Sequence, residues 1–207
     1  VSVSSGIPAF RGDTGLWSEY DPEVYASIAG FLSNPGRSWE FFLELFVQFA
    51  DAKPSKSHKL LAALEKSGKL KQLITQNIDG LHRKAGNEKL IEIHGNFRTT
   101  VCIDCGQLYS LKGMILDTED LPPMCSCGGT LKPDATLFGE PINSQRYFSS
   151  LKALRSADVL LMIGTSGMVH PVSEFPEIAL RHGTRLVEIN PEVSVLSKAY
   201  DTVHIQA

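Results

Sequence analysis

Short apolar runs that alternate with helical patterns are the feature that most restricts the fold of this chain. Strands are predicted at "VLLMIGTS" (159–166), "LKQLITQN" (70–77), "EKLIEIHG" (88–95), "TRLVEINPE" (184–192) and "DTVHIQA" (201–207). The segments 147–158 and 175–183, which lie between the later runs, have helical patterns. Apolar runs unbroken by polar residues are typical of parallel strands that helices cover on both faces. We therefore expect an α/β fold with a parallel sheet.

Residues 13–70 are predicted to be mainly helical. Apolar residues recur at helical spacing in "PEVYASIAGFLS" (22–33) and "SWEFFLELFVQFADA" (38–52), and Asn34-Pro35-Gly36 separates the two. A third helix, "KSHKLLAALEKSG" (56–68), is expected to end at its glycine.

The composition is that of an ordinary globular chain. Of its 207 residues 43% are hydrophobic, which is enough for one large core or for a core with a small lobe. The net charge of −3 and the pI of about 6.1 argue against binding to the phosphate backbone of nucleic acids, because such proteins have a basic excess. The longest apolar stretch, "FFLELFVQFA" (41–50), is too short for a bilayer and contains Glu44. We expect no direct contact with nucleic acid or membranes.

All four cysteines lie in one short segment. Cys102 and Cys105 form "CIDC", and Cys125 and Cys127 form "CSC". Two tight pairs in a chain with no other cysteine favour a metal site in a reducing compartment over the disulfides of a secreted domain. Four thiolates suit tetrahedral zinc, with free or redox-active cysteines as the alternative. We expect residues 98–133 to form a small lobe around a structural Zn2+ ion, because so short a segment has little core of its own.

Polar residues directly follow three of the predicted strands. They are "TQNID" (75–79), "GTS" (164–166) and "INPE" (189–192). Since ligands of parallel sheets bind at the carboxyl ends of strands, these stretches are expected to be converging loops of one site. Ordinary turns also use Asn and Asp as local hydrogen-bond acceptors, and hydroxyl groups after a strand commonly cap the next helix. The pattern alone leaves both interpretations open.

Eight motifs occur in a fixed order along nearly the whole chain. They are "SSGIPAFRG" (4–12), "GLW" (15–17), "TQNIDGLH" (75–82), "IHG" (93–95), the paired cysteines, "FGE" (138–140), "GTS" (164–166) and "INPE" (189–192). Together they make the chain resemble the sirtuins, which are NAD-dependent protein deacylases. The resemblance implies a Rossmann-like NAD-binding domain at 1–97 and 134–207, with a helical insertion at 13–58 and the zinc-ribbon lobe at 98–133. It also implies that NAD is cleaved to nicotinamide and that the acyl group of a lysine is transferred to ADP-ribose.

The two ends of the chain depart from the family pattern. Sirtuins begin with a strand and a Gly-Ala-Gly-x-Ser loop, whereas this chain starts at Val1-Ser2, where that loop should end. They usually add a helix beyond the position of Ala207. By resemblance we expect the chain to lack the first strand, the glycines that approach the diphosphate of NAD and the terminal helix, which would weaken its hold on the diphosphate.

The resemblance also assigns roles to individual residues. His94 is the expected general base, which would take a proton from a ribose hydroxyl of NAD, since imidazole titrates near neutral pH. Asn77, expected near the nicotinamide ribose, is the second catalytic candidate. The expected NAD-binding residues are Phe10, Arg11, Gln76, Asn77, Ile78, Asp79, Gly164, Thr165, Ser166 and Asn190. His82 and Glu188 are expected to be structural.

Two loops are expected to hold an acylated-lysine protein substrate by strand addition. Their residues, by resemblance, are Phe138, Gly139, Met168 and Val169. Gly167 stands where an apolar residue is usual, so the peptide edge is expected to be looser. Relatives that remove succinyl or malonyl groups carry Tyr and Arg where this chain has Phe42 and Leu45. An apolar pocket lacks the cation that would pair with a buried carboxylate, so we predict a preference for neutral acyl groups.

Two alternatives to a deacylase are compatible with the sequence. Some sirtuins transfer ADP-ribose from NAD to proteins, and the motifs discriminate poorly between the two reactions. The other alternative is a zinc-ribbon binding module without catalysis, which the departure at the amino end favours. The lack of a visible targeting signal and the reduced cysteines predict a cytoplasmic location.

Overall fold

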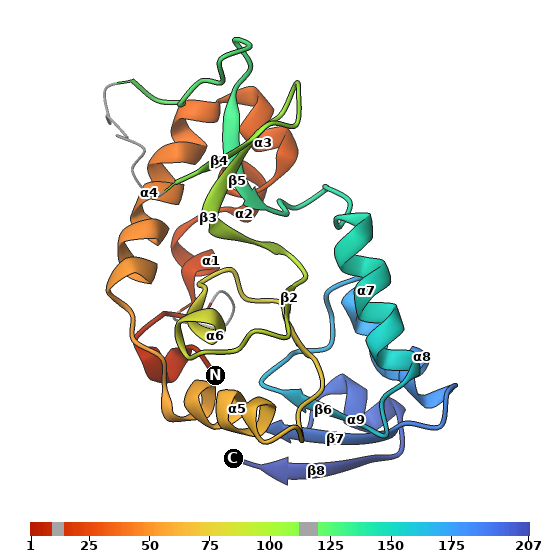
Figure 1. The fold of residues 1–207 in the computed structure, drawn as a ribbon. Helices are drawn as coiled ribbons and strands as arrows, with labels where there is room; N and C mark the ends of the chain where they lie inside the picture. Colours follow the sequence, from red (N-terminus) through yellow and green to blue (C-terminus); the bar gives the residue numbers. More distant parts are fainter. Residues whose placement is uncertain (10–14, 112–119) are drawn as a thin grey trace. The chain divides into compact units, whose positions relative to one another are not determined.

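A computed structural model describes residues 1–9, 15–111 and 120–207, so Phe10 and Arg11 lie outside the described residues. The chain divides into two compact units, one formed by Val1 with Ser144–Ala207 and the other by Ser2–Asn143. Each unit has its own parallel sheet and its own helices (Figure 1). The predicted limits of the NAD-binding domain, the helical insertion and the lobe stay predictions.

Helices make up most of the first half of the unit Ser2–Asn143. They are α1 (Leu16–Glu19), α2 (Pro22–Tyr25), α3 (Ile28–Ser33), α4 (Pro35–Asp51), α5 (Lys56–Lys66) and α6 (Leu81–Lys84), and the 3-10 turn η1 (Val3–Ser5) precedes them. The single helix predicted over 22–33 is two helices, because the Ser27 side chain accepts a hydrogen bond from Gly30 N–H and caps α3. The predicted break at Asn34-Pro35-Gly36 is confirmed, because α3 ends at Ser33 and Asn34 caps the start of α4. Pro35 occupies the first turn of α4, where a missing N–H costs nothing.

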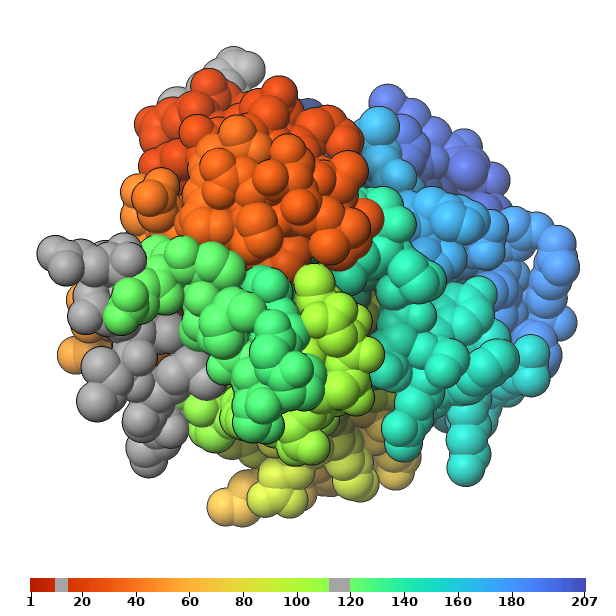
Figure 2. Space-filling model, turned by 90° about the horizontal axis from the view of Figure 1, so that it is seen from above, coloured from red at the N-terminus to blue at the C-terminus, as the bar shows by residue number. Residues whose placement is uncertain are grey.

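The core of this unit is built around α4. Its buried apolar side chains are Trp39, Phe41, Phe42, Leu45 and Phe49. The ring of Phe42 lies 5.8 Å from that of Phe97, and the indole N–H of Trp39 donates to the Leu131 carbonyl at 2.7 Å. These contacts attach the helix to the strands of the cysteine-containing lobe, and the two segments adjoin in the space-filling view (Figure 2). Each such side chain contributes about 1.5–3 kcal/mol by leaving water.

Two sheets complete the same unit. Strand β1 (Leu73–Thr75) pairs in parallel with β2 (Leu90–Glu92). The antiparallel sheet has β3 (Gly95–Cys102) between β4 (Leu108–Ser110) and β5 (Leu131–Ala135). Only Ile93 and His94 separate β2 from β3, so the chain passes directly from the parallel pair into the lobe.

The unit Ser144–Ala207 has a parallel sheet of order β6-β7-β8. Its elements are α7 (Ser144–Arg155), β6 (Val159–Ile163), the 3-10 turn η2 (Val172–Glu174), α8 (Phe175–Leu180), β7 (Arg185–Asn190), α9 (Val195–Ala199) and β8 (Thr202–Gln206). The predicted alternation of parallel strands and helices is confirmed, but the strands fall into two separate parallel sheets. In register, Leu161, Val187 and Val203 lie side by side on one face. Leu161 and Val203 are exposed there.

No helix within the described ranges is long and apolar enough to cross a bilayer.

Candidate active site

The turn that carries His94 is fixed by backbone hydrogen bonds on both sides. Ile93 N–H donates to the Thr75 carbonyl at 3.0 Å, which continues the pairing of β2 with β1. Thr136 N–H donates to the carbonyl of His94 at 2.8 Å. The backbone at His94 is therefore held by two neighbouring segments.

The ring of His94 makes one hydrogen bond that determines its tautomer. Its Nδ1 lies 3.1 Å from the backbone carbonyl oxygen of Gln76. Because a carbonyl only accepts, we assign the proton to Nδ1, which leaves the lone pair on Nε2. Burial lowers the pKa of His94, and the hydrogen bond to Gln76 opposes this effect. The lowered pKa and the lone pair on Nε2 both favour a neutral imidazole that can accept a proton at Nε2.

The loop after β1 is held by a small hydrogen-bond network. Asn77 Nδ2 donates to the Ser2 hydroxyl at 2.8 Å, and this hydroxyl donates to Asp79 Oδ2 at 2.6 Å. The other oxygen of Asp79 accepts from Leu81 N–H at 2.8 Å, and Gly80 turns the chain into α6 with φ of +71°. The network places amide and carboxylate groups side by side, next to the carbonyl that contacts His94. Sequence reasoning did not find Ser2.

Ile78 and His82 flank this network. Ile78 is partly buried and packs against the core of the unit. His82 lies within α6 and is 6% exposed, in agreement with the structural role expected for it.

A second group of predicted residues lies at the carboxyl edge of β6 and β7, in the unit Ser144–Ala207. Gly164 N–H donates to the Ile189 carbonyl at 3.0 Å. Asn190 Nδ2 donates to the Thr165 carbonyl at 3.1 Å. The loop "GTS" and the stretch "INPE" are therefore brought together. Within the loop, the Ser166 hydroxyl accepts a hydrogen bond from Met168 N–H at 3.4 Å.

Glu188 fixes the side chain of Asn190. It is fully buried, its Oε1 accepts from Asn190 Nδ2 at 3.2 Å, and its Oε2 accepts from Ser194 N–H and the Ser197 hydroxyl. Burial raises the pKa of Glu188, but the hydrogen bonds from Ser194 and Ser197 outweigh burial and lower it overall. The expected structural role of Glu188 thus includes the orientation of a predicted NAD-binding side chain. The signal in the sequence was a lone carboxylate within the apolar run "LVEIN".

The predicted substrate residues Phe138 and Gly139 are the first two residues of the "FGE" segment (138–140). Phe138 N–H donates to the Ala26 carbonyl, and its own carbonyl accepts from Ile28 N–H, both at 2.9 Å. The backbone of Phe138 is therefore already paired, and its side chain is 38% exposed.

The other predicted substrate residues, Met168 and Val169, follow Gly167 in the unit Ser144–Ala207. Met168 is 65% exposed. A Cβ added at Gly167 would lie 2.3 Å from Cγ of Leu196, so this buried leucine of α9 fills the space that a side chain would need. The lack of a side chain at Gly167 therefore leaves no empty space beside Leu196.

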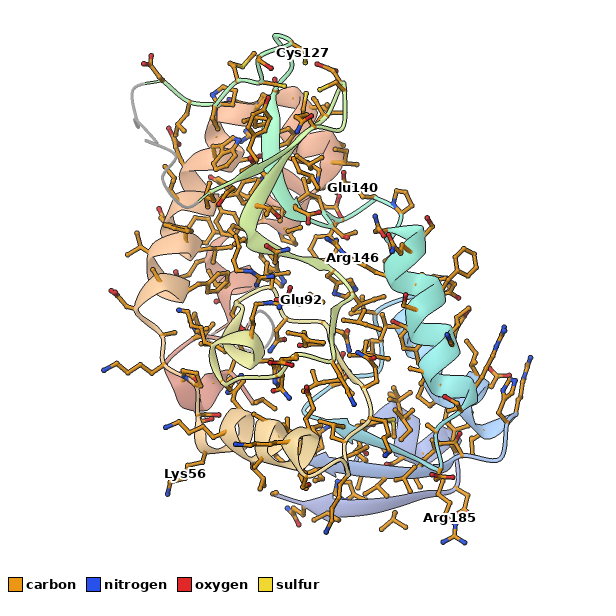
Figure 3. The ribbon with its side chains drawn as sticks, in the orientation of Figure 1. Lys56, Glu92, Cys127, Glu140, Arg146 and Arg185 are labelled. Atoms are coloured by element: carbon orange, nitrogen blue, oxygen red, sulfur yellow. The ribbon has the colours of Figure 1, made fainter. Side chains whose placement is uncertain are left out.

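The four cysteines meet at the tip of the lobe, where Figure 3 labels Cys127. Their sulfur atoms all lie within 4.8 Å of one another. The Cys102–Cys127 pair is 3.6 Å apart and the Cys105–Cys125 pair 3.7 Å apart. A tetrahedron with Zn–S bonds of about 2.3 Å has sulfur–sulfur edges of about 3.8 Å. The thiol set therefore fits zinc in number, chemistry and spacing.

The chemistry of the cluster also calls for a cation. The backbone N–H of Gly129 lowers the pKa of Cys127, but the three neighbouring sulfurs outweigh it and raise this pKa to about 12. The N–H of Cys127 and the Tyr109 hydroxyl, which lies 3.0 Å from the sulfur, lower the pKa of Cys125 to about 6. Four thiolates at this spacing cannot coexist without a positive charge between them. Tyr109 was not found from the sequence.

The Sir2 family model matches residues 1–171. The chain belongs to the Sir2 family. It is 42% identical over 202 residues to the NAD-dependent protein deacylase of Aeropyrum pernix, covering 97% of this chain and 81% of the relative. It is 39% identical over 202 residues to NAD-dependent protein deacylase 2 of Pyrobaculum aerophilum, covering 97% of this chain and 80% of the relative. The family predicted from the eight motifs is thus confirmed.

Solved Sir2 structures have the same fold. A mutant Sir2 homologue in complex with ADP-ribose superposes with a TM-score of 0.92 at 34% identity, covering 99% of this chain and 82% of that chain. Sir2 with a p53 peptide and NAD+ gives a TM-score of 0.87 at 32% identity, covering 99% and 83%.

Proposed function

We propose that this Sir2 protein is an NAD-dependent protein lysine deacylase, which cleaves NAD to nicotinamide and transfers the acyl group from lysine to ADP-ribose. The observation that carries the proposal is His94, whose Nδ1 is bound by the Gln76 carbonyl and whose Nε2 is left as a base. The names of the relatives and the ADP-ribose and NAD complexes of the solved structures support it.

The residues of the loop after β1 suit the nicotinamide end of NAD. A carboxamide needs both donors and acceptors, and Gln76, Asn77 and Asp79 offer both. When bound, NAD would supply the sugar carbon from which nicotinamide leaves. Nε2 of His94 would accept the proton of a ribose hydroxyl and so prepare this hydroxyl to receive the acyl group. Burial lowers the pKa of His94, which favours its base form.

Other predicted residues take the remaining roles in this proposal. Gly164, Thr165, Ser166 and Asn190 bind phosphate or the adenosine ribose, and Ile78 lines the nicotinamide pocket. Phe10 shields the reactive sugar carbon from water, while Arg11 orders its loop. An acylated-lysine protein pairs with the segments at Phe138, Gly139, Met168 and Val169.

The zinc ion has a structural role in the proposal. With four thiolate ligands it has no open position for substrate, and it would hold the ends of β3 and β5 together. Reduced thiolates require a reducing compartment, so we also propose a cytoplasmic location.

The function is tested by incubating the chain with NAD and an acetyl-lysine peptide and following free nicotinamide and the peptide mass. Deacylation is expected to release nicotinamide and to remove an acetyl group, and His94→Gln should lower the rate at least about 100-fold. His182→Gln, at an exposed histidine, is the matched control and should retain the wild-type rate. Mass added to a protein would identify ADP-ribosyl transfer instead, and no nicotinamide release in wild type would contradict both reactions.

A further inference from the structure

A buried carboxylate lies two residues before His94. Glu92 is the last residue of β2 and is 8% exposed. The guanidinium of Arg98 donates to it twice, from Nη1 to Oε1 at 2.7 Å and from Nη2 to Oε2 at 2.5 Å. Arg83 adds a second cation, with Nη2 3.9 Å from Oε2. Figure 3 labels Glu92 between the ribbon of α6 and the start of β3.

The three charged residues come from the elements that surround the proposed base. Glu92 ends β2, Arg98 is on β3, and Arg83 is in α6; the turn that carries His94 lies between β2 and β3. Nη1 of Arg98 lies 3.2 Å from the position that a Cβ on Gly80 would occupy. The guanidinium therefore contacts the end of the proposed nicotinamide loop while it binds the carboxylate. Asp134 is a further charge that acts on Arg98.

The backbone pairing between β1 and β2, which precedes the turn with His94, is short. β1 and β2 have three residues each, and Thr75 opposite Glu92 is their last pair in register. Gln76 and His94 follow just beyond this pair, so their 3.1 Å contact lies where the ladder ends. Two strands of this length do not hold their ends rigidly by themselves. A bidentate ion pair has a defined geometry as well as energy, so it can supply the missing restraint.

We propose that the Glu92–Arg98 pair is a positioning device that keeps the imidazole of His94 against the Gln76 carbonyl and thereby presents Nε2 as the base. The inference rests on the proposed deacylase function. Glu92 and Arg98 are positioning residues, because they act through His94 and not on the substrate.

Glu92→Gln is the variant that tests the device. An amide keeps the size of the side chain but has a single acceptor and no charge, so the bidentate pair is lost. Deacylation kcat is expected to fall about 10-fold, while KM for NAD changes less than about twofold, because the effect of misplacing a base appears in the proton-transfer step. Arg98→Met should reproduce the loss. Arg98→Lys keeps the charge without the fork and should recover part of the rate.

The pH profile separates positioning from general damage. A less tightly held imidazole changes both its exposure to water and its hydrogen bond to the Gln76 carbonyl, so the acidic limb of kcat against pH should move in Glu92→Gln. The exchange of labelled nicotinamide into NAD occurs before the proton transfer to His94, so the rate of this exchange should be retained in Glu92→Gln. The proposal would be overturned if Glu92→Gln lost nicotinamide exchange and deacylation equally at every pH while the acidic limb of kcat stayed in place. Glu177→Gln is the matched control, because Glu177 pairs with Arg181 on an exposed surface, and it should leave all readouts unchanged.

A measurement without turnover keeps this inference separate from the proposed function. Histidine-selective 15N NMR reports the tautomer and the titration of His94 directly. In wild type the proton should reside on Nδ1, and in Glu92→Gln the tautomers should mix. Identical spectra in the two proteins would overturn the positioning role even if the enzyme is a deacylase. If wild type shows no deacylation but the spectra differ, the proposed function fails and the positioning of His94 stands.

Discussion

The imidazole rings of His58 and His82 lie 4.6 Å apart, centre to centre, at a tilt of 56°. His58 is in α5 and His82 in α6, and both are buried. Nδ1 of His58 accepts from Ser55 N–H at 3.2 Å and completes a capping box at the start of α5. Nε2 of His58 and Nδ1 of His82 are buried without a partner among the described residues. The pair packs well only when both rings are neutral.

Acid is expected to destabilise the protein through these rings. Burial lowers the pKa of His58 to about 4, with His82 adding to this effect and Asp79 opposing it. Burial lowers the pKa of His82 as well, again against Asp79. Because the unfolded chain binds more protons below about pH 6.5, this stability is complete above that pH and is lost as the pH falls toward about 4. The slope is at most about 1.4 kcal/mol per pH unit for each histidine.

His58→Gln should reduce this acid sensitivity. Glutamine can keep the capping box but cannot be protonated, so the free energy of unfolding should vary less between about pH 4.5 and 6.5. Urea unfolding across this range measures the slope. His182→Gln, at an exposed histidine, should keep the wild-type slope, and an unchanged slope in His58→Gln would contradict the role of the pair.

Removal of zinc should unfold the lobe. Chelation, or Cys125→Ser, is expected to lower the thermal midpoint by at least about 10 °C, since the binding energy of a structural zinc ion is folding energy. Metal analysis should find one zinc ion per chain in wild type and much less in the variant. Met124→Ala, which truncates the exposed neighbour of Cys125, should retain the metal and the midpoint. Equal thermal midpoints with and without chelator would contradict this prediction.

The elements that the sequence predicted are those with a long pattern. The run at 159–163 is β6, and the helical spacing around Trp39 is α4. The helix α9, with five residues, escaped because it is too short to establish a period. The break between α2 and α3 escaped because a single capping serine, Ser27, outweighed an apolar spacing that continues across it.

The candidate site was predicted unevenly for a similar reason. Motif order predicted His94 and the loop at 76–79 as parts of one site, and the structure brings the His94 ring to the Gln76 carbonyl. Their roles stay predictions. Ser2 hydrogen-bonds to Asp79 across 77 residues, and no local pattern encodes such a contact. Glu92 and Glu188 were missed as partners for a related reason, since a carboxylate within an apolar strand does not reveal which donors the fold brings to it.

Glu188→Gln should weaken the hold on the adenosine end of NAD. The carboxylate accepts from Asn190 with one oxygen and from Ser194 and Ser197 with the other. An amide has only one acceptor oxygen, so at least one of these donors must face its NH2 group and Asn190 loses its fixed orientation. Calorimetric titration with ADP-ribose should show Kd about 10-fold higher. Glu192→Gln, at an exposed position of the same segment, should bind like wild type, and equal affinities of all three proteins would exclude this role.

The predicted preference for neutral acyl groups follows from α4. Phe42 and Leu45, where acidic-acyl relatives are expected to carry Tyr and Arg, are each only 2% exposed within the apolar core. We expect kcat/KM for an acetyl-lysine peptide to exceed that for a succinyl-lysine peptide at least about 10-fold, since nothing there pairs with a carboxylate. The double change Phe42→Tyr with Leu45→Arg should cost several kcal/mol of stability without conferring desuccinylation, because it buries a guanidinium in that core.

Val47→Arg is the matched control for this prediction, because Val47 is 62% exposed on the same helix. Arginine there keeps its charge in water, so the urea midpoint should stay near that of wild type. If the double variant were as stable as Val47→Arg and gained desuccinylation, Phe42 and Leu45 would have to line a pocket that accepts a charge, and the predicted loss of stability would be wrong. The preference for neutral acyl groups would be contradicted if wild type removed succinyl groups as fast as acetyl groups.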